Sequence, residues 1–320
     1  MSDGRRLLHG LAGVFAFCFI ALGALYIAIN KFPERFENFD TLVAIWVKKT
    51  ETSSRRFPRV LVLGDSTAAC GLYAPTFERA LSVATLNSSP VEVYFDLKRR
   101  LKTREAPACA VMALSWDWEH YKHFFWRTFN RAGFYSPQEL DEIFRVSEET
   151  QSFPATSMSR WKYDLNAQLY SRRARGLNLS DLQDALFNPP EPSKAQKVAG
   201  LVRNRGSIQL PAKLTVPPPE GDLPEGETSN LFRVYAEKIF ELAQQHSIRI
   251  FFVEIPKTES EAAIIPHWFR ESAEKYGIVM LKPEMNWSET DFSYPHHLRA
   301  ETAIRLTEYV RGKIQNDCYR

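Results

Sequence analysis

The chain has 320 residues, 44% of them hydrophobic and 25% charged, and its 41 Lys and Arg against 38 Asp and Glu give a net charge of +3. This near balance excludes a strongly basic nucleic-acid platform and an acidic disordered tail, and we expect no nucleic-acid partner. The composition is that of a globular protein. The charges are unevenly spread, because no Asp, Glu, Lys or Arg occurs between Leu7 and Asn30.

The uncharged run from Leu7 to Asn30 predicts a membrane-spanning helix. As a helix it would be roughly 36 Å long, enough to cross the hydrocarbon core of a bilayer. Arg5 and Arg6 precede it and place the N-terminus in the cytoplasm. We favour an uncleaved signal anchor in residues 1–30, with a cleaved signal peptide or a buried core helix as alternatives.

With such an anchor, the protein would be a single-pass protein of the inner (cytoplasmic) membrane. Residues 31–56 resemble a polar stalk, and residues 57–320 would form an extracytoplasmic, periplasmic domain.

From residue 57 onward, short apolar runs alternate with helical patterns. We expect strands at 59–63, 83–86, 109–114, 248–255 and 278–281, and helices at 90–102, 230–245, 262–276 and 299–314. Apolar strands that alternate with helices indicate a parallel sheet covered on both faces. The fold class is therefore α/β, and the reactive loops should gather at the carboxyl ends of the strands.

Residues 119–229 break this alternation. They contain an aromatic stretch, an acidic helical pattern near 137–149 and a proline-rich segment, so we expect a mostly helical insertion followed by a long loop. The insertion carries Arg172, Arg173 and Arg175. These arginines would contact an anionic glycan or lipid headgroups, or they form a solvated helix face, which we favour.

Gly64-Asp65-Ser66, at the end of the first predicted strand, is the clearest chemical signal. A glycine there permits a tight turn, and a serine after a buried strand projects into the crevice at the sheet edge. An ordinary turn is the alternative. A nucleophilic serine needs a base, and among the seven histidines the pair at 296 and 297, before the last helix, is best placed.

Gly64-Asp65-Ser66 near the start, with His297-Leu298 before the last helix, resembles the SGNH (GDSL) hydrolase superfamily. It is most similar to the membrane-anchored branch, which includes alginate O-acetylation and teichoic-acid D-alanylation proteins. The resemblance covers roughly residues 58–118 and 230–315. It implies a three-layer, flavodoxin-like parallel sheet, with Ser66 as nucleophile and His297 as general base. No cofactor or metal is implied.

The chain departs from the family pattern at three places. Tyr294 stands where the family has an aspartate three residues before the histidine, and Asp291 is the expected substitute. No glycine occurs in the second block and no asparagine in the third, and these positions supply oxyanion donors in the family. The oxyanion and support positions are then expected at Asp65, Asn87 and Asp117, with Ser115 as the alternative to Asp117.

The resemblance implies a serine acyltransferase or esterase that acts on an extracytoplasmic polysaccharide or another envelope glycan. A multipass membrane acyltransferase would be the donor partner. The alternative is an inactive scaffold or glycan-binding subunit of an envelope polysaccharide modification or export system. Trp116 and Trp118 would stack on sugar rings, or they belong to the core, which we favour.

Four cysteines occur in the chain, and Cys18 lies in the apolar run. The other three have no metal-type spacing. We expect Cys70, Cys109 and Cys318 to be buried free thiols, with a Cys70–Cys109 bridge as the alternative.

Overall fold

The computed structural model describes residues 13, 15–21, 23–24, 58–103, 105–116, 125, 134–171, 200–201, 203–208, 230–256, 265–294 and 297–319. The expected membrane anchor lies mostly outside these ranges, and the expected stalk lies entirely outside them. Within the described residues, no helix has both the length and the apolar character needed to cross a membrane.

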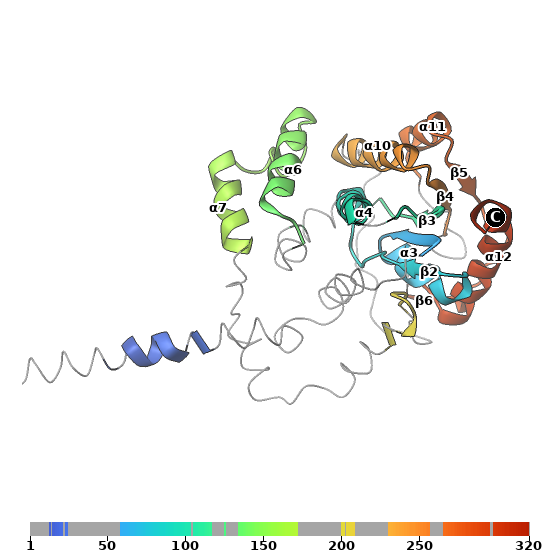
Figure 1. Cartoon of the computed structure of the whole chain (residues 1–320), viewed down its shortest axis with the longest axis horizontal. Coiled ribbons are helices and arrows are strands. Elements are labelled where there is room, and N and C mark those ends of the chain that lie inside the picture. Colours follow the sequence, from blue (N-terminus) through green and yellow to red (C-terminus); the bar gives the residue numbers. More distant parts are fainter. Residues whose placement is uncertain are drawn as a thin grey trace, which may run out of the picture.

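A five-stranded sheet forms the centre of the domain, and all its strand pairs are parallel. In spatial order its strands are β2 (Ala80–Ser82), β1 (Val60–Gly64), β3 (Cys109–Ala113), β4 (Arg249–Val253) and β5 (Val279–Leu281) (Figure 1). This 2-1-3-4-5 order occurs in doubly wound α/β folds. The predicted parallel sheet is confirmed.

The second strand lies slightly earlier in the chain than the sequence predicted, at Ala80–Ser82 rather than at 83–86. The expected segment nevertheless continues along β1, because the backbone N–H groups of Val83 and Thr85 donate to the carbonyl oxygens of Val62 and Gly64.

Helices cover both faces of the sheet (Figure 1). One face carries α4 (Pro90–Thr103), α10 (Asn230–Gln245) and α11 (His267–Lys275). The other face carries α3 (Ser66–Gly71) and α12 (Ala300–Cys318). Buried residues of β1 alternate between the two faces, as the period of a strand requires. Leu61 and Leu63 pack toward α4 and α10, and Val60 and Val62 pack toward α3 and α12.

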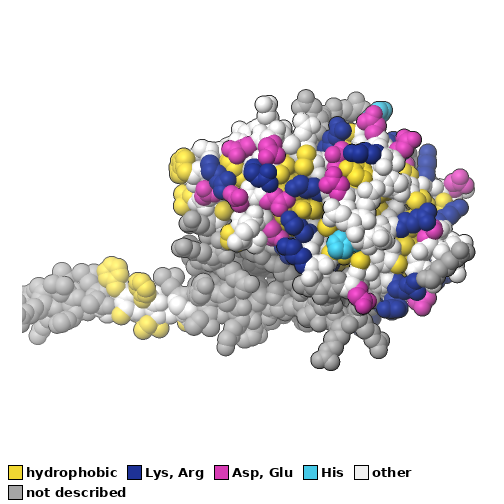
Figure 2. Space-filling model, turned by 45° about the horizontal axis from the view of Figure 1, so that its top comes forward, with side chains coloured by type: hydrophobic (Ala, Val, Ile, Leu, Met, Phe, Trp, Pro, Cys, Tyr) yellow, Lys and Arg dark blue, Asp and Glu magenta, His cyan; other side chains and the backbone are white. Residues whose placement is uncertain are grey.

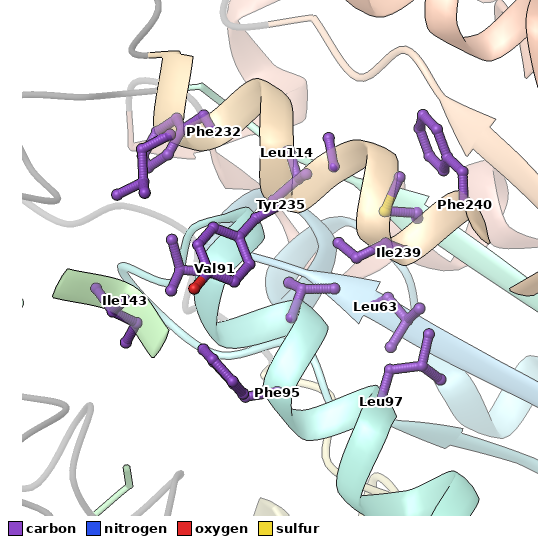
Figure 3. Close-up of a cluster of buried hydrophobic side chains, with 14 of the residues drawn as sticks. Leu63, Val91, Phe95, Leu97, Leu114, Ile143, Phe232, Tyr235, Ile239 and Phe240 are labelled. Atoms are coloured by element: carbon purple, nitrogen blue, oxygen red, sulfur yellow. The ribbon is translucent and has the colours of Figure 1, made fainter. Parts of the chain in front are cut away.

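The apolar layer between the sheet and α4 and α10 is closely packed. Figure 3 shows Val91 and Phe95 of α4 facing Tyr235 and Ile239 of α10. Sequence periodicity predicted α10 with the bounds it has, because its apolar residues recur on one side of the helix.

Side-chain hydrogen bonds cap the starts of two helices. At α4, Glu92 accepts from the Ser89 backbone N–H at 2.7 Å, and the Ser89 hydroxyl accepts from the Val91 N–H at 3.2 Å. At α6 (Pro137–Glu149), the acidic helix predicted within the insertion, Ser136 and Glu139 form a complete capping box. The described part of the insertion also includes α7 (Arg160–Ser171).

Ion pairs fasten α6 to the α/β domain. The Glu142 carboxylate lies 3.1 Å from the ammonium group of Lys98 on α4 and 2.6 Å from that of Lys238 on α10. On the face drawn in Figure 2, acidic and basic side chains are interspersed.

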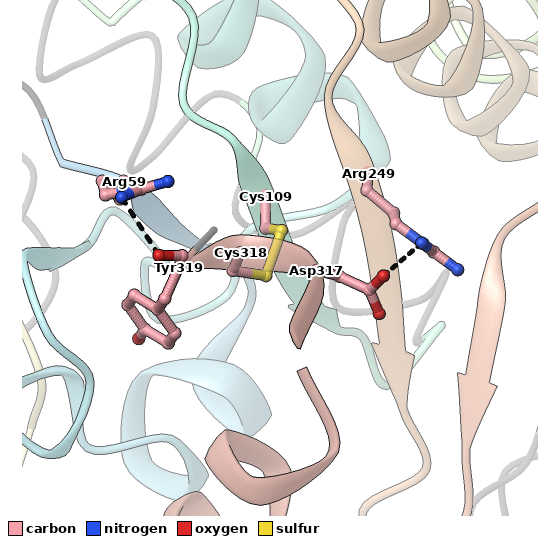
Figure 4. Close-up of a disulfide and its surroundings, with 6 residues drawn as sticks. All are labelled: Arg59, Cys109, Arg249, Asp317, Cys318 and Tyr319. Carbon is pink, nitrogen blue, oxygen red and sulfur yellow. Dashed lines mark hydrogen bonds and ion pairs between the residues drawn. A yellow bond between two sulfur atoms is a disulfide. The ribbon is translucent and has the colours of Figure 1, made fainter. Parts of the chain in front are cut away.

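A disulfide joins Cys109, the first residue of β3, to Cys318, the last residue of α12 (Figure 4). The prediction of free thiols was therefore wrong for these two residues, and the alternative Cys70–Cys109 bridge is not formed. Cys70 is buried and its thiol forms no disulfide, as expected. The two bridged residues are 209 positions apart, and only the return of α12 along the sheet brings them together.

Candidate active site

The carboxyl ends of β1 and β3 form the switch point of the sheet, because the chain runs outward from β1 to β2 and then returns to β3 on the other side. Ligands of doubly wound folds bind in the crevice at this point. Gly64-Asp65-Ser66 ends β1 here, and Ser115 and Trp116 follow β3. The segment Gly64-Asp65-Ser66 and the segment that begins at Ser115, both expected to contribute to the site, therefore lie side by side.

Gly64 is required at the end of β1. Its φ of +132° is unfavourable for residues with a side chain. A Cβ atom added to it would lie 1.8 Å from the carbonyl oxygen of Ala113 in β3. The glycine thus allows the turn to approach β3 closely.

Asp65 caps α3 and links it to β3. One carboxylate oxygen accepts from the Thr67 backbone N–H at 2.8 Å. The other accepts from the backbone N–H of Ser115 at 2.7 Å and from the Ser115 hydroxyl at 2.5 Å. Burial raises the pKa of Asp65, although the hydrogen bonds from Ser115 and Thr67 act in the opposite direction.

Ser66 is the first residue of α3 and is half-buried. Among the described residues, its hydroxyl forms no hydrogen bond, and none joins it to His297 Nε2. The first N–H groups of a helix have no acceptor within the helix, and the Ser66 N–H is one of them. Ser66 therefore combines a hydroxyl and a backbone donor at the switch point.

His297 lies on a strand that packs against α3. It belongs to β7 (His297–Leu298), which pairs antiparallel with β6 (Phe292–Tyr294). Leu298 anchors this hairpin, because it is buried in the same cluster as Ala68 and Ala69 of α3. The structure thus brings the elements of Ser66 and His297 together, and the Nε2 atom of His297 is buried.

Asn87 lies in a turn held next to Gly64. The Gly64 carbonyl oxygen accepts from the Thr85 N–H at 3.0 Å and from the Ser88 hydroxyl at 2.7 Å. Asn87 has a φ of +59°, a left-handed conformation that glycine adopts most readily and that asparagine tolerates. The Asn87 backbone thus has a conformation that glycine would also adopt.

The Asp291 carboxylate holds together the segment before β6 and the start of α12. One oxygen accepts from the Thr302 hydroxyl at 2.8 Å and from Arg305, and the other from the Ser288 N–H at 3.0 Å and its hydroxyl at 2.9 Å. Burial alone would raise the pKa of Asp291, but these hydrogen bonds and the Arg305 charge hold it below its usual value. Its expected role as the partner of His297 stays a prediction.

Tyr294 stands three residues before His297, where the resemblance led us to expect an aspartate. It pairs directly with His297 across the β6–β7 ladder, so this position does lie beside the histidine.

Trp116 is only 6% exposed and lies among aromatic rings on the α11 side of the sheet. Its ring centroid is 4.6 Å from that of Phe269 and 5.2 Å from that of Trp268. Its φ of +61° is rare for so large a residue. This arrangement agrees with the interpretation that we favoured from the sequence, in which Trp116 belongs to the core rather than to a sugar-binding surface.

Asp117, Trp118 and His296 lie outside the described residues, as do Arg172, Arg173 and Arg175. Sequence reasoning missed the hydrogen bonds of Ser115 to Asp65. The signal that could have indicated these hydrogen bonds is the position of Ser115, whose hydroxyl follows β3 at the same edge of the sheet as Asp65. Within the described part of the chain, no group of three or more His, Cys, Asp or Glu could hold a metal ion.

Comparisons of the chain with family models, with curated proteins and with solved structures find no match. The resemblance to SGNH hydrolases therefore stays a prediction from Gly64-Asp65-Ser66 and His297-Leu298.

Proposed function

We propose that this protein is an SGNH-type serine acyltransferase or esterase that acts on an extracytoplasmic polysaccharide through an acyl-Ser66 intermediate. The observation that carries the proposal is the position of Ser66. It begins α3 at the switch point of the sheet, and the strand that contains His297 packs against the same helix.

In the proposed reaction, the Ser66 hydroxyl attacks the carbonyl carbon of the acyl donor, and His297 takes the hydroxyl proton. The bond to the leaving group breaks, and His297 returns the proton to that group. A sugar hydroxyl or water then attacks the acyl-enzyme and gives its own proton to His297, which passes it back to Ser66. The Ser66 N–H and the turn around Asn87 would stabilise the negative oxygen of each tetrahedral intermediate.

Two features support an extracytoplasmic location. The Cys109–Cys318 disulfide is of a kind that forms and persists in oxidising compartments such as the periplasm. The described part of the N-terminal apolar run is helical, and its large side chains Phe15, Phe17, Phe19 and Ile20 are between 68% and 79% exposed (Figure 2). Such a surface suits a lipid environment, as an anchor in the inner membrane would have.

An anchored enzyme would meet substrates that stay at the membrane surface, such as growing glycan chains. A multipass membrane acyltransferase would supply the acyl group in such a system. The acyl group itself would be small, for example acetyl, as in the family that the chain resembles.

The direct test is covalent labelling of the full chain with a fluorophosphonate, in which the serine oxygen displaces fluoride from phosphorus. We expect a single adduct on Ser66, lost in Ser66→Ala and retained in Ser157→Ala, which alters an exposed serine outside the site. His297→Gln should slow labelling by about 100-fold or more, because it removes the base. A folded protein that gives no Ser66-dependent adduct would reject the proposal.

Transfer and hydrolysis can then be separated with an activated acetyl ester. Addition of an oligosaccharide acceptor should speed release of the leaving group and yield acetylated sugar if the enzyme transfers acyl groups. Release that is unaffected by the acceptor and yields only acetate indicates an esterase.

One observation favours a second candidate, a scaffold that kept the fold and lost the chemistry. The Asp291 carboxylate is fully engaged by Ser288, Thr302 and Arg305, so it is not free to orient an imidazole. This candidate predicts that cells with Ser66→Ala acylate their glycan normally. Complete loss of glycan acylation in that variant would reject it.

A further inference from the structure

A second concave site lies at the opposite, amino edge of the sheet. It is a cavity of about 590 Å³ between the segment that leads into β2 and the C-terminal half of α12. Three arginines line it, Arg79, Arg205 and Arg311, and Glu78 is the one acidic residue among its lining residues. The volume is within the range of small-ligand sites, which are usually more apolar than this one.

The backbone around two of these arginines is fixed by the sheet. The Arg79 carbonyl oxygen accepts from the Arg59 N–H at 2.8 Å, and the Arg205 carbonyl oxygen accepts from the Ser82 N–H at 2.9 Å. Arg79 and Arg205 have φ values of +50° and +49°, which residues with side chains seldom adopt. Both arginines therefore line the cavity from backbone positions that hydrogen bonds hold in place.

The α12 wall of the cavity is also fixed. The disulfide joins the end of α12 to β3, Arg59 donates to the Tyr319 carbonyl oxygen at 3.4 Å, and Asp317 pairs with Arg249 (Figure 4). Arg311 and Tyr319 line the cavity from this clamped segment. A site that is rigid before binding loses less free energy when a ligand binds.

Charge decides which ligand the cavity suits. Among the described residues that line the cavity, three guanidinium groups against one carboxylate leave a formal excess of two positive charges, and the end of α12 offsets only about half a charge. Arg205 and Arg311 each use one terminal nitrogen on a backbone carbonyl oxygen, at 3.4 and 3.3 Å. Their remaining N–H groups can form the paired hydrogen bonds by which arginine binds phosphate oxygens.

We propose that this cavity binds a phosphate group carried by a larger molecule, through Arg79, Arg205 and Arg311. A phosphate group matches the two excess positive charges, and the volume leaves room for the molecule that carries it. Two sources share this chemistry: the headgroup of an anionic phospholipid and a soluble phosphorylated compound. The cavity lies at the amino edge of the sheet, whereas Ser66 follows the carboxyl end of β1, and none of the residues proposed for the acyl-transfer reaction lines the cavity.

The test uses the full chain in a nonionic detergent and two probes at constant ionic strength. Inorganic phosphate is titrated by calorimetry, and binding to mixed micelles that contain phosphatidylglycerol is compared with binding to micelles that contain phosphatidylcholine. Arg205→Gln and Arg311→Gln each remove one guanidinium group from the cavity. Arg145→Gln is the control, since it removes the same charge from an exposed ion pair on α6.

Saturable phosphate binding that falls about tenfold or more in Arg205→Gln and Arg311→Gln, but not in Arg145→Gln, supports the site and a soluble ligand. Binding to phosphatidylglycerol micelles with this same variant dependence, without measurable binding of free phosphate, supports the site and a lipid headgroup. The proposal is overturned if the cavity variants, with unchanged thermal midpoints, bind both probes like the wild type. Equal losses in all three variants would also overturn it.

Discussion

The Asp65 carboxylate accepts both the backbone N–H and the hydroxyl of Ser115, at 2.7 and 2.5 Å, and so joins the ends of β1 and β3. Its other oxygen caps α3 through the Thr67 N–H. A single buried side chain therefore sets the angle at which α3 leaves the sheet. The position of Ser66, which lies between Asp65 and Thr67, depends on these contacts.

Asp65→Asn should destabilise the domain by about 1–3 kcal/mol, because the new amide nitrogen would face a donor where an oxygen now accepts. Fluorophosphonate labelling of Ser66 should also slow, since the start of α3 would shift. Urea unfolding and labelling rates check both effects. Asp164→Asn, which alters an exposed ion pair with Arg160, should change stability by less than about 1 kcal/mol. Equal effects of the two changes would contradict this role of Asp65.

Gly64→Ala should prevent folding or cost more than about 3 kcal/mol, because its Cβ would lie 1.8 Å from the Ala113 carbonyl oxygen. Gly277→Ala is the matched control. Gly277 also has a positive φ, of +66°, but nothing lies within 4 Å of an added Cβ. Gly277→Ala should therefore lower the free energy of unfolding by only about 1–2 kcal/mol, through backbone strain alone. Thermal and urea unfolding of the two variants separate the steric clash from the backbone strain.

Glu92 should make stability fall as pH rises through neutrality. It is 2% exposed, and its carboxylate accepts from Ser89 and from the Tyr135 hydroxyl. Burial raises its pKa from 4.5 to about 7 despite these hydrogen bonds. The folded state thus holds a proton that the unfolded state has lost between these pH values. The resulting stabilisation is complete below pH 4.5 and is lost as pH rises through about 7.

Because of this carboxyl group, the free energy of unfolding measured with urea should be greater at pH 5 than at pH 8, by on the order of 2 kcal/mol. Other groups also titrate in this range, so the informative quantity is the change that Glu92→Gln produces. That variant should reduce the difference between the two pH values. An unchanged difference would show that Glu92 has an ordinary pKa in the folded protein.

The Cys109–Cys318 bridge predicts a defined thiol count. Alkylation of the unfolded chain without reductant should label Cys18 and Cys70, and reductant should expose all four cysteines. The double change Cys109→Ser and Cys318→Ser should cost about 2–5 kcal/mol, because the bridge closes a long loop of the unfolded chain. Cys70→Ser, which leaves the bridge intact, is the comparison for alkylation. Labelling of four thiols without reductant would exclude the bridge.

Local signals predicted most of the helices and strands. Ser89 with Glu92 marked the start of α4, because both residues of the capping pattern lie within four positions of the chain. The bounds of α10 followed from its apolar period. The second strand was predicted a few residues too late, at 83–86 instead of Ala80–Ser82. Residues 83–86 do hydrogen-bond to β1, but they do not form a regular strand.

The candidate site was less predictable from sequence. Ser66 and His297 were chosen by chemistry, and the structure places their elements in contact. The contacts of Asp291 could not be foreseen, because Thr302 and Arg305 compete for its carboxylate from the next helix. Trp116 combines a rare backbone conformation with burial, and neither is evident from residue type.

The sequence by itself determined where this chain forms strands and helices, and where glycine permits a turn ahead of Ser66. These features depend on neighbouring residues, whose periodicity and capping are visible in the order of the amino acids. Only the tertiary structure decided the strand order, the Asp65–Ser115 link and the Cys109–Cys318 bridge. Each of these joins residues far apart in the chain, and their pairing depends on how apolar faces pack over the whole domain. The membrane anchor expected from the uncharged run at the N-terminus stays a prediction from the sequence.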